Sequence, residues 1–153
     1  MNEITVNQVA NWYLSKAPMS PKKLQKILYY AYVWFLTLMN ESYDNIENRL
    51  FENHFEAWVH GPVCPEIYYN YKEYGYNDIP QVKSNIPAFS SDVEDILQQV
   101  WDVYGEYTAG QLESISHQES PWINARGNCS AYEICDNRIT DEDIYKCYAA
   151  RIS

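Results

Sequence analysis

The sequence contains few glycines, and none of them belongs to a phosphate-binding motif. Only five glycines occur in 153 residues, and neither the P-loop pattern nor G-x-G-x-x-G is present. Both motifs use glycine to bring the backbone close to phosphate groups. Nucleotide binding by these two routes is therefore excluded.

Cysteine and histidine are also scarce, and their spacing favours neither a metal centre nor a catalytic pair. The four cysteines form no C-x-x-C pair, and Cys129 and Cys135 lie further apart than the cysteines of a usual zinc knuckle. Cys64 follows His60 by four residues, but a Gly-Pro turn between them removes helical adjacency. A nucleophile pair also needs a third group to orient its base, and the sequence shows none, so we expect no catalytic residue. We also expect no metal and no cofactor. A hydrolase that uses Cys64 or His117 is the least favoured function.

No apolar run in the sequence is long enough to cross a bilayer. The longest run, Ile27 to Met39, is interrupted by Thr37 and falls short of the roughly 20 residues that a spanning helix needs. Met1 leads into a polar helix start and not into a basic and then apolar stretch, so we expect no signal peptide. We expect a cytoplasmic protein with reduced thiols and no membrane partner.

Basic residues are few, and the second half of the chain is strongly acidic. The formal net charge is −10. Residues 1–83 contain nine acids and seven bases, whereas residues 84–153 contain twelve acids and four bases. Such a surface repels a phosphate backbone, so nucleic acid is not expected as a partner. It suits a basic protein partner, and an acidic surface that only maintains solubility is the alternative.

Aromatic residues, by contrast, are abundant. The sequence has five Trp and fifteen Tyr, and its hydrophobic content of 46% is too high for a disordered chain. Tyr and Trp fill helical cores, and those left at the surface are well suited to protein interfaces. The length matches one domain with one core, so we expect a single domain over residues 1–153.

Helix-start signals predict a mainly α-helical fold. Capping-box pairs occur at Thr5 with Gln8, Ser91 with Glu94 and Thr108 with Gln111. Further signals are Ser-Pro pairs at 20–21 and 120–121, and Thr140 followed by three acids. The predicted helices cover residues 5–16, 21–40, 63–74, 91–104, 108–118, 121–126 and 141–151. The alternating stretch 53–59 is a predicted strand that residues 81–86 could pair with, giving at most a small two- or three-stranded antiparallel sheet.

The predicted helix 21–40 is the expected centre of a compact domain. It is apolar on nearly all sides, so other elements must cover it. Its first turns carry Lys22, Lys23 and Lys26 at the positive end of the helix dipole, which is unfavourable. We expect these lysines to reach acidic groups within the domain, and contact with a ligand is the alternative.

Two aromatic corners are the candidate binding sites. The first leads from Glu56 to the Gly-Pro turn at 61–62, and the second runs from His117 to Trp122. The alternative is that both are rigid structural corners. In the helix after the first corner, helical spacing assigns Ile67, Tyr71 and Tyr74 to the core and leaves their neighbours on flanking faces. The predicted partner-binding residues are Tyr68, Tyr69, Trp58, His60, His117 and Trp122.

Four blocks of the sequence resemble the Panacea-domain antitoxin family, the SocA/GepA-like phage-associated proteins. The blocks are KLQKILYYA at 23–31, EAW and GPVCPEIY at 56–58 and 61–68, YKEYG at 71–75, and His117 with Pro121-Trp122. They occur in the expected order, and the resemblance covers about residues 8–148. The motif positions carried over are Lys23, Tyr29, Trp58, Gly61, Pro62, His117, Pro121 and Trp122.

The resemblance implies a bacterial or phage cytoplasmic antitoxin that neutralises a cognate toxin by direct protein–protein binding. One branch of the family instead implies a proteolytic adaptor, which delivers a client protein to an ATP-dependent protease. His60 departs from the family pattern, because an aromatic residue is usual before Gly-Pro. Cys64 also departs from it, because an aliphatic residue is usual there.

Overall fold

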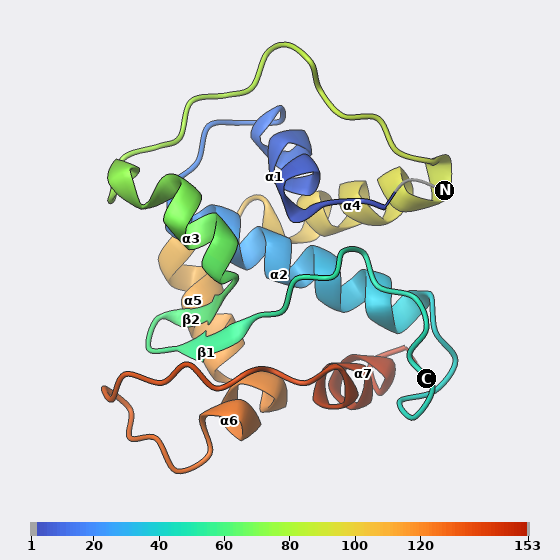
Figure 1. Ribbon diagram of the computed structural model, residues 1–153, viewed down its shortest axis with the longest axis vertical. Helices are drawn as coiled ribbons and strands as arrows, with labels where there is room; N and C mark the ends of the chain where they lie inside the picture. The colour runs from blue at the N-terminus through green and yellow to red at the C-terminus, as the bar shows by residue number, and fades with distance from the viewer. Residues whose placement is uncertain (1–2, 153) are drawn as a thin grey trace.

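Helix α2 (Pro21–Leu38) runs through the middle of the computed structural model, which describes residues 3–152 (Figure 1). Thirteen of its 18 residues are buried, and α1, α3, α4, α5, α7 and β2 all pack against it. The remaining helices are α1 (Val6–Leu14), α3 (Pro65–Tyr71), α4 (Ser91–Tyr104), α5 (Ala109–His117), α6 (Ser120–Arg126) and α7 (Asp141–Ala149). The prediction of a mainly helical fold around a buried central helix is confirmed.

Most predicted helix starts are present in the structure, and two are displaced by one residue. Thr5 and Thr108 each form a complete capping box, and the side chains of Ser20 and Thr140 also cap their helices. Helix α4, however, is capped by Ser90 and not by Ser91. The carboxylate of Glu94 accepts a hydrogen bond from the backbone N–H of Phe89, one residue before Ser90, at 2.8 Å.

Helix α6 begins at Ser120, so the expected cap at Ser120 is wrong and Glu119 occupies the cap position. The Glu119 side chain is buried and is used elsewhere. Its carboxylate accepts hydrogen bonds from the hydroxyls of Tyr30 and Tyr148, both at 2.7 Å, and from Arg151 Nη2 at 2.8 Å. The Glu119 carboxylate therefore links Tyr30 of α2 to Tyr148 of α7 at the position where α6 begins.

Strand β1 (Glu56–Trp58) pairs antiparallel with β2 (Gly61–Val63), which directly follows it in the sequence. The expected pairing with residues 81–86 is wrong. The other edge of β1 is taken by a late segment of the chain, since the Ala57 N–H donates to Asn137 O at 2.8 Å. Residues 81–86 instead lie beside the end of α1, where the Val82 N–H donates to Leu14 O at 3.1 Å.

None of the helices within residues 3–152 is long and apolar enough to cross a membrane.

Candidate partner-binding face

Two side chains of α2 form hydrogen bonds with the backbone of the second hairpin strand and of the residue that follows it. The Gln25 side-chain amide forms two hydrogen bonds with the backbone of Cys64, donating to its carbonyl at 3.0 Å and accepting from its N–H at 2.9 Å. Lys26 Nζ donates to the carbonyl of Pro62 at 3.2 Å. Both side chains are buried. Because buried backbone groups need such partners, the second strand is fixed to α2.

Helix α6 holds the first strand in the same way. Trp122 Nε1 donates to the carbonyl of Trp58 at 2.9 Å, and Arg126 Nη1 donates to the carbonyl of Ala57 at 3.1 Å. Arg126 Nη2 also donates to Glu133 O at 2.9 Å. Arg126 is buried and charged, so its hydrogen bonds to carbonyls stabilise it in place of an ion pair. No motif or spacing in the sequence marks Arg126 as part of the site.

The turn of the hairpin requires glycine at position 61. Gly61 has φ +109°, a conformation that other residues rarely adopt. A Cβ atom there would lie 2.7 Å from Lys26 Cε and 3.0 Å from Ser116 Oγ. The backbone therefore approaches α2 and α5 more closely than any side chain at this position would allow.

The three lysines of α2 do find partners inside the domain, although two of the partners are carbonyls and not acids. Lys22 forms an ion pair with Glu113. Lys23 Nζ donates to the carbonyl of Gly105 at 2.6 Å. Lys26 is only 1% exposed, and burial together with the nearby charge of Lys22 lowers its pKa to about 7, although Glu113 acts in the opposite direction.

The second aromatic corner packs directly behind the first. The rings of His117 and Trp122 are stacked, with centroids 4.0 Å apart and planes 17° from parallel. Both side chains are partly buried, and burial lowers the pKa of His117. The structure therefore places these two predicted residues behind the hairpin, where they support its backbone.

The other four predicted residues lie together on the outer side. Tyr69 is 64% exposed, Tyr68 and His60 are also exposed, and Trp58 is partly buried. The rings of Trp58 and Tyr68 meet edge to face at 4.9 Å, and those of Tyr68 and Tyr69 at 5.4 Å. His60 Nδ1 lies 3.3 Å from the Glu113 carboxylate. We call Trp58, His60, Tyr68 and Tyr69 the hairpin face.

The core assignment within the following helix is correct for Ile67 and wrong for Tyr74. Ile67 is fully buried and Tyr71 is partly buried against the core, but Tyr74 is exposed. Helix α3 ends at Tyr71, and Lys72–Tyr74 form the 3-10 helix η1. A 3-10 helix has 3.0 residues per turn and not 3.6, so Tyr74 does not follow the spacing of the α-helix.

A groove of about 570 Å³ opens on the hairpin face and is lined by Trp58, His60 and Tyr69. Its wall also includes Ile134, which is 92% exposed and lies in the loop between α6 and α7. No feature of the sequence predicts that Ile134 contributes to this wall. An isoleucine in a segment without helical spacing indicates a possible apolar contact. It does not show which surface of the protein that segment approaches.

The hydrolase interpretation receives no support from the position of Cys64. Its thiol is buried, and burial raises its pKa to about 11. Because the thiolate is the reactive form of cysteine, this thiol is a poor nucleophile. Within residues 3–152, no group of three or more His, Cys, Asp or Glu is arranged to hold a metal ion.

Comparison with known proteins identifies a family and a relative of this chain. Residues 24–123 match the family model described as antitoxin SocA-like, Panacea domain. The protein Antitoxin SocA of Caulobacter vibrioides (strain NA1000 / CB15N) is 30% identical over 160 aligned residues, which cover 90% of this chain and 81% of the relative. No solved structure matches the chain.

Proposed function

This chain belongs to the Panacea-domain family of SocA-like antitoxins, and we propose that it neutralises a cognate toxin by binding it directly through the hairpin face. The observation that carries the proposal is the arrangement of Trp58, Tyr68 and Tyr69. These aromatic side chains adjoin one another on the outer side of a hairpin whose backbone is held from behind. We further propose that residues 1–153 act as one domain, because α1 and α7, from opposite ends of the chain, both pack on α2.

The hairpin face has the properties of an interface anchor. Tyr and Trp offer large contact areas and lose little conformational entropy on binding. A backbone held by Lys26, Trp122 and Arg126 is already ordered before the partner arrives, which lowers the entropic cost of association. In this proposal His117 and Trp122 position the hairpin and make no direct contact with the toxin.

Charge around the groove indicates which kind of toxin surface fits. Glu56 and Asp136 line it together with the aromatic side chains. Complementary charge speeds association and excludes partners of the wrong sign. A toxin segment with basic residues beside an apolar anchor is therefore the expected ligand.

Growth rescue in cells tests this proposal. A small toxic reading frame is first sought beside this gene, and it is then expressed alone, with the wild-type chain, and with the double variant Tyr68→Ala/Tyr69→Ala. We expect the wild type to restore growth and the double variant to fail while it still accumulates as a folded protein. Tyr76→Ala is the matched control, because Tyr76 is fully exposed and does not line the groove.

The same assay in a host that lacks its ATP-dependent proteases separates the two family mechanisms. Direct neutralisation predicts that rescue persists without the protease. If rescue disappears there while the toxin still binds, the chain acts as a proteolytic adaptor and occlusion of the toxin is the wrong mechanism.

A further inference from the structure

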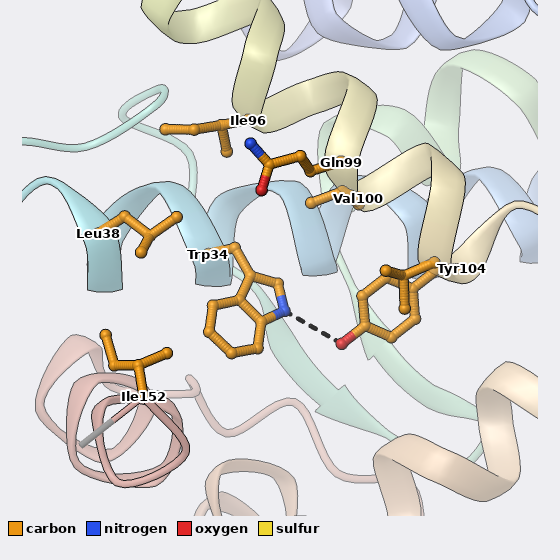
Figure 2. Close-up of a pocket in the computed structure, with 8 residues that line it drawn as sticks. Trp34, Leu38, Ile96, Gln99, Val100, Tyr104 and Ile152 are labelled. Atoms are coloured by element: carbon orange, nitrogen blue, oxygen red, sulfur yellow. Dashed lines mark hydrogen bonds between the residues drawn. The ribbon is translucent and has the colours of Figure 1, made fainter.

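A second surface, with no residue in common with the hairpin face, lies between α2, α4 and the end of the chain (Figure 2). It is an apolar groove of about 260 Å³. In the close-up, Trp34 lies between Leu38 and Tyr104, and Ile152 approaches from the C-terminal side. We call this surface the α2–α4 groove.

The indole N–H of Trp34, at the base of the α2–α4 groove, already has a hydrogen-bond partner. Trp34 Nε1 donates to the Tyr104 hydroxyl at 3.0 Å, and the Trp34 ring meets Tyr148 edge to face at 5.2 Å. Around this floor, Leu38, Val103 and Ile152 are exposed, Val103 to 58%. None of the residues that line the groove is charged. Such a surface gains most from apolar side chains that cover it.

One side of the groove is bordered by negative charge. Asp92, Asp95 and Asp102 are exposed on α4 and recur at helical spacing with Gln99, which itself lines the groove. Residues three and four apart on a helix are neighbours. Asp95 and Asp102 therefore flank Gln99 directly, so a ligand seated in the groove lies beside an acidic stripe.

We propose that the α2–α4 groove binds a basic amphipathic helix of a partner protein. Apolar residues at helical spacing on that helix would cover Trp34 and Val103, and its lysines or arginines would face Asp95 and Asp102. This inference goes beyond toxin neutralisation and does not depend on it.

The acidic stripe also argues against a second copy of this chain as the occupant. A two-fold dimer brings the same patch of both subunits together. Asp92, Asp95 and Asp102 would then face their own copies, and like charges in close apposition disfavour association.

A peptide titration tests the proposal on the full chain. The probe is a labelled synthetic 14-residue helix with leucines along one face and lysines along both flanks, followed by fluorescence anisotropy. A second peptide carries glutamate in place of every lysine. We expect the lysine peptide to bind about tenfold or more tightly than the glutamate peptide, and its affinity to fall as salt is added.

Two pairs of variants distinguish the groove from general attraction to an acidic protein. Val103→Asn keeps the net charge and should weaken binding about tenfold, whereas Ile123→Asn, a change at an exposed isoleucine outside the groove, should not. Asp95→Asn with Asp102→Asn should lower the affinity and its salt dependence more than Glu52→Gln with Glu73→Gln, which removes two exposed charges outside both grooves. Equal binding of both peptides, equal effects within either pair, or concentration-dependent dimerisation that Val103→Asn abolishes would overturn the proposal.

Discussion

Protonation of Lys26 makes the stability of the protein depend on pH. Its ammonium group is buried and donates to the carbonyl of Pro62, and its pKa is lowered to about 7 chiefly by burial. Below pH 7 both the folded and the unfolded chain carry the proton, and the cost of burying the charge is present in full. Between about pH 7 and the ordinary lysine pKa of about 10.4, the unfolded chain binds more protons. The free energy of unfolding should therefore rise with pH in this range.

We predict that Lys26 contributes about 2 kcal/mol of additional stability between pH 7 and pH 9, since one proton accounts for about 1.4 kcal/mol per pH unit. Urea unfolding at both pH values measures this rise. Lys26→Met should remove most of it, and Lys83→Met, a change at an exposed lysine, should leave it unchanged. A rise of the same size in Lys26→Met would show that another group is responsible. Above pH 10 the buried tyrosines, whose pKa values are raised by burial, would reverse the trend.

Gly61 is the second residue at which local geometry decides the fold. Gly61→Ala and Gly75→Ala both place a side chain at positive φ, where backbone strain is expected. Only at Gly61 would the new Cβ also collide with Lys26, because nothing lies within 4 Å of the corresponding position at Gly75. We predict that Gly61→Ala loses about 2 kcal/mol more stability than Gly75→Ala. Equal losses in chemical denaturation would mean that the close approach to Lys26 is unimportant.

At the scale of elements, the helices were predictable because their signals are local. A capping residue and the amide that it accepts from are three residues apart, so Thr5 and Thr108 could be identified from the sequence. The strand pairing was not predictable in the same way. The outer edge of β1 contacts Asn137, about eighty residues later, and only the packing of α6 and its following loop brings that segment close.

The start of α4 offers a direct test at this scale. Ser90 caps the helix and accepts from the backbone N–H of Val93, whereas Ser91 is already inside it. We predict that Ser90→Ala destabilises the protein by about 1 kcal/mol, and that Ser91→Ala changes stability by less than about 0.5 kcal/mol. Thermal or chemical unfolding of the two variants measures the difference. A larger loss of stability in Ser91→Ala than in Ser90→Ala would instead support the capping box of Ser91 with Glu94 that the sequence predicts.

At the scale of the whole molecule, the motif residues converge on the hairpin from elements far apart in the chain. The sequence identified the aromatic positions, but it could not separate those that support the backbone from those that face outward. His117 and Trp122 stack behind the hairpin, whereas Tyr69 points to the surface. That division depends on how α5 and α6 pack, which helical spacing within each element does not determine. The wall formed by Ile134 could not be predicted for the same reason.

The most direct test of the account is the affinity of the purified chain for its cognate toxin, measured by calorimetric titration. We predict a stable complex with the wild type. Tyr68→Ala/Tyr69→Ala should lose about 2 kcal/mol or more of binding free energy, which is about thirtyfold in Kd, without loss of folding stability. Tyr76→Ala should bind as the wild type does. Absence of binding by the wild type, or unchanged affinity of the double variant, would contradict direct neutralisation through the hairpin face.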